Sequence, residues 1–214
     1  AELTNLRAIG GIYNNYIQIV AEKSSGISSL EDLKGKTISV GAPASGTELN
    51  AREIFKAADM SYDDMGRVEF LPFSESAELI KNRQLQSTLQ SAGLGAAFIK
   101  DLATTHDITI VAIPAEVVEK IGPPYIATVI PAGTYDGQDA DVPTAAVTNI
   151  LVTSDKVSDE MVYAMTKLMF ENIDKLKAAH SAAAALDPAN AVKDLPIPLH
   201  PGAEKYYREI GVLN

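Results

Sequence analysis

Residues 37–58 read TISVGAPASGTELNAREIFKAA, and they predict a strand that runs through a turn of small residues straight into a helix. Thr37–Val40 is β-branched and apolar, as in a buried strand, and Gly41–Gly46 is small enough to pass close to a ligand. From Thr47 onward the spacing of apolar residues is helical. A strand followed at once by a helix is the building unit of α/β folds.

The start of this helix fits two roles. At the first turn of a helix several backbone N–H groups lack partners and carry the positive end of the helix dipole, so a carboxylate or phosphate can bind there without Lys or Arg. Ser45 stands three residues before Glu48, which is also the spacing of an ordinary capping box. The residues alone leave both interpretations open, a helix cap and a ligand site.

Further strand-like segments follow along the chain, and helical patterns separate most of them. The four strands predicted in series are Thr37–Val40, Val68–Phe73, Ser87–Ser91 and Ile108–Ile113. A helix is expected at about residues 76–83, with Ser74 or Ser76 as its cap. This alternation favours an α/β domain with a largely parallel sheet, in which ligands bind beyond the carboxyl ends of the strands.

The second half of the chain predicts two more strands, Tyr125–Pro131 and Ala145–Thr153. The polar segment between them contains Asp136, Asp139 and Asp141. Their spacing is not that of an EF-hand loop, so we interpret the segment as a solvated turn rather than a calcium site.

Residues 158–186 are expected to be helical, and a short final helix is expected over residues 201–210. The long helix carries an apolar stripe made of Met161, Met165, Leu168, Met169 and Ile173. Methionine-rich stripes usually pack in a core, so this helix is expected to be covered.

The composition is that of a globular protein with a sizeable core, because 46% of its 214 residues are hydrophobic. No apolar run approaches the roughly 18 residues that a membrane span needs, and residues 1–11 lack the basic and apolar regions of a signal peptide. An exported protein would therefore be seen here in processed or shortened form. The net charge of −10, without Lys/Arg clusters interleaved with aromatics, makes nucleic acid and anionic membranes poor partners.

The sequence offers no recognisable cofactor, metal or catalytic constellation. It contains no cysteine, and its three histidines, His106, His180 and His200, are far apart in the chain. Gly93 and Gly95 are not followed by the third glycine of a dinucleotide fingerprint. No Ser, His and acid arrangement and no pair of carboxylates near a turn can be identified, so catalysis has little support.

Long stretches of the chain resemble one protein family. These stretches are LRAIGGIYNNYIQIVAEKSSGISSLEDLKGKTISVGAPASGTELNAREIF, FLPFSESAELIKNRQL, LQSAGLG, PPYIATVIPAGTYDGQDADVPTAAVTNILVT and HPGAEKYYREIGV. They are similar to the extracytoplasmic solute receptors of the TAXI branch of TRAP transporters, and the likeness covers essentially the whole chain. Its most specific motifs are DLKGKTISVGAP-x-SGTE and IPAGTY-x-GQD-x-DVPT.

The resemblance implies a type II periplasmic binding-protein fold, with two α/β lobes joined by crossing strands and a ligand cleft between them. It implies a periplasmic receptor that captures a small carboxylate, such as glutamate, a related amino acid or a dicarboxylate. The receptor would deliver this solute to TRAP membrane subunits that use an ion gradient. It would carry out no catalysis and need no cofactor.

The resemblance also assigns ligand-binding residues. Residues 10–15 resemble the lobe-one segment that presents a tyrosine to the cleft, residues 45–47 resemble the lobe-two helix terminus that faces the ligand, and residues 90–93 resemble the strand end that lines the far wall. Ala44 stands where the family often has glycine. The residues that these matches place in the site are Tyr13, Asn15, Ala44, Ser45, Gly46, Thr47, Gln90, Ser91, Ala92 and Gly93.

Receptors of this family begin with two strand-helix units that precede the LRAIGG strand, and this sequence lacks them. Residues 28–144 would form a complete lobe two, and residues 1–27 with 145–214 an incomplete lobe one. The loss would uncover apolar side chains such as Met165, Leu168 and Met169. Because exposed sheet edges pair readily, we expect a homo-oligomer through the lobe-one edges.

Two other functions remain open. One is a ligand-free structural or interaction fragment, which the absence of the opening units favours. The other is an enzyme on the same α/β architecture, against which the lack of catalytic residues speaks. Ligand-dependent thermal stabilisation would separate a receptor from the first, and turnover of a candidate acid would separate it from the second.

Overall fold

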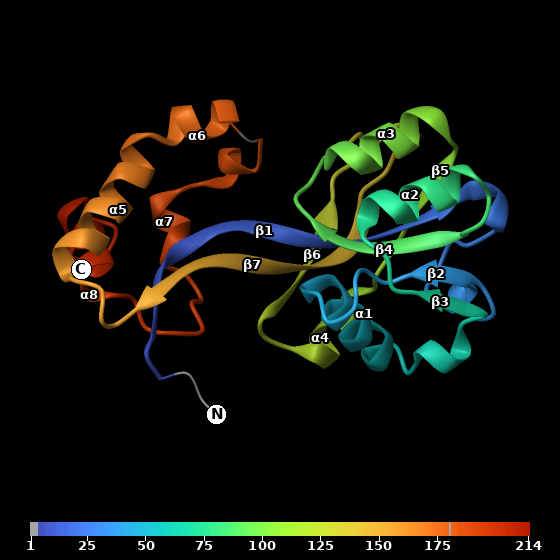
Figure 1. Cartoon of the computed structure of the whole chain (residues 1–214), viewed down its shortest axis with the longest axis horizontal. Helices are drawn as coiled ribbons and strands as arrows, with labels where there is room; N and C mark the ends of the chain where they lie inside the picture. Colours follow the sequence, from blue (N-terminus) through green and yellow to red (C-terminus); the bar gives the residue numbers. More distant parts are fainter. Residues whose placement is uncertain (1–3, 180) are drawn as a thin grey trace. The chain divides into compact units, whose positions relative to one another are not determined.

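The computed structural model describes residues 4–179 and 181–214, so His180 lies outside the described residues. The chain divides into two compact units, which we call unit 1 (Ala1–Asn14 with Thr148–Asn214) and unit 2 (Asn15–Val147). Two long strands, β1 (Leu6–Glu22) and β7 (Val142–Ser154), each continue from one unit into the other (Figure 1). The lobe boundaries predicted after residues 27 and 144 stay predictions.

Unit 2 contains four strands that run in the same direction. They are β2 (Thr37–Ser39), β3 (Arg67–Glu69), β4 (Ser87–Ala92) and β5 (Ile108–Val111). β2 is parallel to β3 and β4, and β1 is antiparallel to both β4 and β5. These four strands correspond to those predicted in series, and the predicted parallel arrangement is confirmed for them. β6 (Tyr125–Ile130) pairs antiparallel with β7.

Helices cover both faces of this sheet (Figure 1). The α-helices of unit 2 are α1 (Gly46–Ala57), α2 (Phe73–Lys81), α3 (Ala97–Thr105) and α4 (Ala115–Ile121). Short 3₁₀ helices are η1 (Lys23–Ser25), η2 (Glu31–Leu33) and η3 (Tyr62–Asp64). α1 and α4 pack in one core with Ile17 and Ile19 of β1, and α2 and α3 pack in the other with Val20, because side chains alternate along a strand. The predicted mixed α/β class is confirmed.

The second predicted strand and the helix after it begin earlier than the sequence indicated. α2 starts at Phe73, which the sequence pattern places in the strand, and its N-cap is Pro72, whose side chain makes no capping hydrogen bond. Ser76, an expected cap, lies inside the helix. Its buried Oγ is 2.8 Å from Ser39 Oγ in β2 and 3.1 Å from the Pro72 carbonyl oxygen. The partner offered by β2 thus decides the role of this hydroxyl.

The polar segment between β6 and β7 is only partly solvated. Asp136, Asp139 and Asp141 are exposed, as predicted for a solvated turn. Tyr135 and Gln138 are instead buried, and the Gln138 amide nitrogen lies within 3.1 Å of three carbonyl oxygens of the same region. The segment is therefore folded onto unit 2.

Unit 1 is built around two helices in close contact, α5 (Asp159–Glu171) and α8 (Pro201–Glu209). A Cβ atom at Gly202 would lie 2.2 Å from the Asp159 carbonyl oxygen, so only glycine allows this approach. The buried core of the unit consists of Ile9, Val162, Phe170, Ala191, Ala203, Tyr206 and Tyr207. α8 agrees with the predicted final helix.

The region predicted to be helical, residues 158–186, is helical over most of its described length, but it is divided into shorter segments. α5 is followed by Asn172, whose Nδ2 donates to the Leu168 carbonyl at 2.9 Å and satisfies the helix end. The segments after it are α6 (Ile173–Ala179), η4 (Ser181–Ala185) and α7 (Pro188–Ala191). In the described part of the chain, no helix combines the length and apolar character needed to cross a lipid bilayer.

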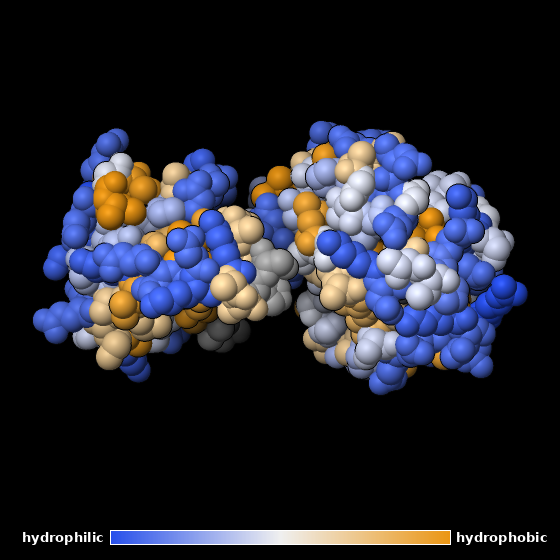
Figure 2. Space-filling view, turned by 90° about the horizontal axis from the view of Figure 1, so that it is seen from above, coloured by the Kyte–Doolittle hydropathy of each residue, from blue (hydrophilic) through white to orange (hydrophobic). Residues whose placement is uncertain are grey.

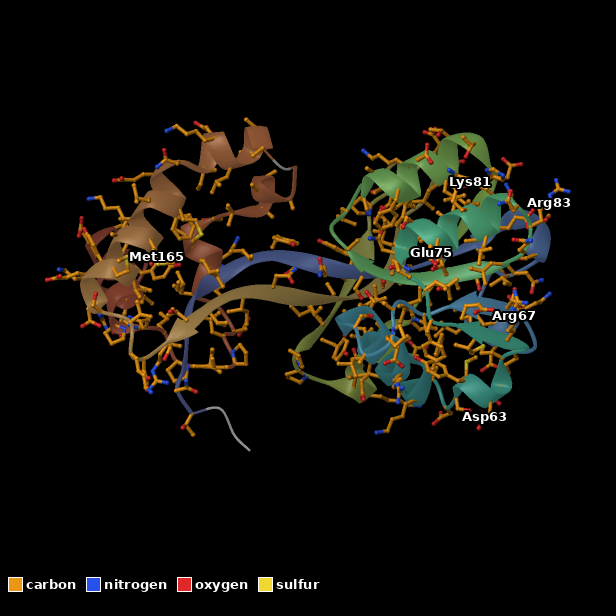
Figure 3. The ribbon with its side chains drawn as sticks, viewed as in Figure 1. Asp63, Arg67, Glu75, Lys81, Arg83 and Met165 are labelled. Atoms are coloured by element: carbon orange, nitrogen blue, oxygen red, sulfur yellow. The ribbon has the colours of Figure 1, made fainter. Side chains whose placement is uncertain are left out.

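The apolar stripe of α5 is largely uncovered. Met161, Met165 and Leu168 are 57%, 43% and 60% exposed, whereas Met169 and Ile173 are partly buried. The core-facing positions are Val162, Thr166 and Phe170. The interpretation as a core stripe is therefore wrong for these three residues, and the exposure expected from the resemblance is observed at Met165 and Leu168 but not at Met169. Figure 3 labels Met165 on α5, and Figure 2 shows apolar side chains among polar ones on the surface.

Candidate ligand-binding site

The N-terminus of α1 presents unpaired backbone N–H groups. Ser45 is the N-cap, and its Oγ accepts a hydrogen bond from the Glu48 N–H at 3.2 Å. The N–H groups of Gly46 and Thr47 make no hydrogen bond to the described residues. Gly46 is exposed, and a Cβ atom built on it would meet nothing within 4 Å. A carboxylate oxygen can therefore reach these two donors.

The turn before α1 is closely folded. Gly41 has a φ of +91°, and a Cβ atom there would lie 2.8 Å from the Thr47 side chain. Ala44 has a φ of +56°, in the left-handed region where glycine is favoured. A glycine at this position would adopt the same conformation without strain.

The reciprocal half of the predicted capping box is not formed. The Ser45 N–H donates to the Ala42 carbonyl at 3.1 Å, and the buried carboxylate of Glu48 bonds instead to Arg52 and to the Tyr62 hydroxyl. A buried carboxylate is costly unless it is paired, and Arg52 lies one turn further along the same helix. This pairing offsets a negative charge that would otherwise oppose an anion at the helix start.

Two hydrogen bonds of Asn50 join α1 to β4 and to β6. Asn50 Nδ2 donates to Ser91 Oγ at 2.8 Å, and Asn50 Oδ1 accepts from the Tyr125 hydroxyl at 2.8 Å. Burial, together with the charge of Glu53, raises the pKa of Tyr125, so its hydroxyl remains a donor at neutral pH. The predicted site residue Ser91 is therefore tied to the helix that carries Gly46.

β1 brings Asn15 to the same edge of unit 2. In the antiparallel pair of β1 and β4, Tyr16 lies opposite Ala92, and Asn15 directly precedes Tyr16. Gly93 directly follows Ala92, beyond the carboxyl end of β4. The start of α1, Asn15 and the end of β4 thus belong to one edge, where open α/β sheets bind ligands.

Two predicted residues do not share this arrangement. Gln90 is only 6% exposed, and its Nε2 donates to Thr88 Oγ1 at 3.1 Å within the sheet. Tyr13 belongs to unit 1, where its carbonyl oxygen accepts from Asn149 Nδ2 at 3.3 Å. Their assignment to the site stays a prediction.

The residues that support this edge were missed by the sequence analysis. Asn50 and Tyr125 connect α1 with neighbouring strands, and Gln18 and Tyr135 contact the turn after β4. One signal was available: Gln18 is a polar residue within an apolar strand, and such residues usually make buried hydrogen bonds. Its partner in the turn and Tyr135 could not be found from local spacing.

A depression elsewhere on unit 2 has an acidic lining. It lies beside β3 and α2, and its lining residues are Glu69, Leu71, Ser74, Glu75, Glu78 and Leu79. Figure 3 labels Glu75 on α2. Carboxylates in the lining repel an anionic ligand, whereas the start of α1 offers N–H donors. The start of α1 is therefore the better candidate for an anion.

Solved structures similar to this chain include three solute-binding proteins. An ancestral arginine-binding protein bound to arginine has a TM-score of 0.44 and 19% identity, over 79% of this chain and 62% of that chain. The periplasmic aliphatic sulphonate binding protein of Escherichia coli has a TM-score of 0.42 and 12% identity, over 86% of this chain and 50% of that chain. The arginine-, lysine-, histidine-binding protein of the thermophilic bacterium Geobacillus stearothermophilus has a TM-score of 0.46 and 10% identity, over 83% of this chain and 61% of that chain.

The chain spans less than two thirds of the length of each of these three proteins. The match to a protein family is more extensive. The NMT1-like family matches residues 1–211, which is nearly all of the sequence. The chain therefore belongs to the NMT1-like family.

Proposed function

We propose that this chain acts as a periplasmic solute receptor of the TAXI branch of TRAP transporters. In this role it binds a small carboxylate, a glutamate-like amino acid or a dicarboxylate, and passes it unchanged to TRAP membrane subunits. The family match over residues 1–211 and the TAXI-like motifs of the sequence support the proposal.

The main support for an acidic solute is the set of backbone N–H groups at the start of α1. At the start of α1 the N–H groups of Gly46 and Thr47 have no hydrogen-bond partner among the described residues, and Ser45 already caps the N–H of Glu48. Such a helix start binds a carboxylate without Lys or Arg, which suits a chain whose net charge is −10. The fixed dipole acts within one turn, whereas the overall charge is screened beyond about 8 Å at physiological salt.

A thermal-stability panel tests this function. The purified chain is heated with L-glutamate, L-aspartate, 2-oxoglutarate, succinate and, as neutral controls, L-glutamine and glycerol. A solute present at 100 times its dissociation constant adds about 2.7 kcal/mol to the free energy of unfolding. We expect stabilisation by at least one acid and none by glycerol. Mass spectrometry of the bound acid before and after incubation should show no turnover, because the proposed role is capture.

A second candidate role, self-association of this chain, is favoured by the uncovered side chains of α5. Met161, Met165 and Leu168 lie along one side of the helix and are about half exposed. A second copy would cover them. Sedimentation at micromolar concentration should then show a dimer that Leu168→Glu converts to a monomer. A monomer in both cases rejects this role and leaves the receptor proposal untouched.

A further inference from the structure

Two buried polar side chains meet beside the end of β4. Gln18 comes from β1 and is 0% exposed, and Tyr135 comes from the segment between β6 and β7 and is 3% exposed. They are 117 positions apart in the chain, yet the Tyr135 hydroxyl donates a hydrogen bond to Gln18 Oε1. Neither residue belongs to the predicted ligand site.

The other end of the Gln18 amide holds the backbone beyond β4. Gln18 Nε2 lies 3.1 Å from the Ala92 carbonyl oxygen and 3.4 Å from the Gly93 carbonyl oxygen. The amide thus donates to two carbonyls and accepts from one hydroxyl, which fixes its orientation. Removing any one of these partners would leave a buried polar group unsatisfied.

Tyr135 is also close to the remainder of the turn. Burial raises the pKa of Tyr135 to about 12, against the opposing influence of the backbone N–H groups of Gly95 and Ala96 and of Gln18. The hydroxyl therefore stays protonated and donates at neutral pH. α3 starts directly after this turn, and its N-cap, Ala96, has no side chain that could cap the helix. The turn depends on groups from other elements for its conformation.

We propose that Gln18 and Tyr135 are positioning residues that fix the backbone of residues 92–96 at the edge of the solute site. The inference rests on the proposed function, because that function gives this edge its role. Gln18 and Tyr135 act through the turn and do not contact the solute. A merely structural role would stabilise unit 2 without a specific effect on residues 92–96.

Tyr135→Phe separates the two roles, with Ser76→Ala as the matched control. Each variant removes one hydroxyl and leaves a buried partner unpaired within unit 2, Gln18 in the first case and Ser39 in the second. Only Tyr135 is linked to the turn. Amide hydrogen exchange of residues 92–96 is measured by NMR for the wild type and both variants, beside global stability in urea.

We expect exchange of residues 92–96 to become at least about tenfold faster in Tyr135→Phe than in Ser76→Ala at equal global stability, since a local opening is limited by local contacts. Equal rates in the two variants would overturn the proposal. If Tyr135→Phe does not fold, hydrogen exchange of the Gln18 side-chain amide protons in the wild type tests the network instead. Slow exchange of these protons supports the network, and exchange as fast as in free glutamine overturns it.

Calorimetric titration with L-glutamate tests the link to the site. We expect an affinity about threefold to tenfold lower in Tyr135→Phe than in the wild type, and an unchanged affinity in Ser76→Ala. Faster exchange with unchanged affinity would overturn the role of the turn in binding. If the wild type binds no L-glutamate, the proposed function fails for this solute, while the exchange rates still decide whether Tyr135 positions the turn.

Discussion

The Tyr62 hydroxyl donates a hydrogen bond of 3.0 Å to the carboxylate of Glu48, whose side chain is 2% exposed. This bond joins η3 to the first turn of α1, next to the unpaired N–H groups of Gly46 and Thr47. Burial, reinforced by the hydrogen bond and charge of Glu48, raises the pKa of Tyr62 above its ordinary value. The hydroxyl therefore stays a donor throughout the neutral range.

Tyr62→Phe should lower the free energy of unfolding by about 1.5–3 kcal/mol, the range for a hydrogen bond to a charged group. The buried carboxylate of Glu48 would then keep only Arg52 as its partner among the described residues. Tyr163→Phe is the control, because the Tyr163 hydroxyl bonds to Glu209 at 2.7 Å in an exposed place. Its loss should destabilise the protein much less, because water screens and replaces an exposed hydrogen bond. Urea denaturation gives both values, and similar losses would contradict a special role for the buried carboxylate.

Ala44→Gly should stabilise the protein by about 0.5–1 kcal/mol, because Ala44 has a φ of +56° and glycine adopts this conformation without strain. Part of the gain is offset by the greater flexibility of glycine in the unfolded chain. Ala51→Gly, inside α1, should instead destabilise by about 1 kcal/mol or more. Opposite shifts of the thermal midpoint are expected, and a loss in both variants would argue against strain at Ala44.

Gly202→Ala should destabilise the protein by about 1–3 kcal/mol, because its Cβ would lie 2.2 Å from the Asp159 carbonyl oxygen and force α8 away from α5. Gly46→Ala serves as the control, since the added Cβ would meet nothing within 4 Å. The thermal midpoint should fall only in the first variant. An unchanged midpoint in Gly202→Ala would mean that the two helices separate without cost.

The stability of unit 2 should depend on the ionisation of Asp32 in acid. Hydrogen bonds from the backbone N–H and hydroxyl of Ser28, and further ones from Ser29, lower the pKa of Asp32 to about 2. Because this folded-state value lies below the unfolded value of about 3.9, the contribution is present above about pH 4 and is lost as pH falls towards about 2.

Asp32→Asn should therefore be less stable than the wild type at pH 7 and should lose less stability between about pH 4 and 2. Urea midpoints across this interval measure the difference. An NMR titration that places the Asp32 carboxyl at its ordinary pKa would contradict the expectation.

Gly46→Val should weaken binding of the acid that stabilises the wild type in the thermal panel by about tenfold or more. The valine methyl groups would crowd the approach to the N–H groups of residues 46 and 47. Thr47→Ser keeps the backbone and should bind nearly as the wild type does. Binding should also weaken only modestly between low and high salt, since the donors are dipoles. A steep loss with salt would indicate Arg or Lys contacts instead.

Much of unit 2 could be predicted because its helices and strands follow from the spacing of residues that are close together in the sequence. The strand before Gly41, the cap at Ser45 and the helix after it all follow from patterns that span two to four residues. The same holds for the strand that ends at Ala92, and for the mixed α/β class. The candidate anion-binding helix start was predicted for this reason.

Only the tertiary structure decided which polar groups meet. The Ser76 hydroxyl, expected to cap a helix, instead donates a hydrogen bond to Ser39. The Tyr135 hydroxyl donates to Gln18, which is 117 positions away in the chain. The break in the helical region at Asn172, after α5, was likewise not evident from the periodicity of the sequence. A buried donor is satisfied by whatever acceptor folding brings close, and the spacing of residues along the chain carries no record of that partner.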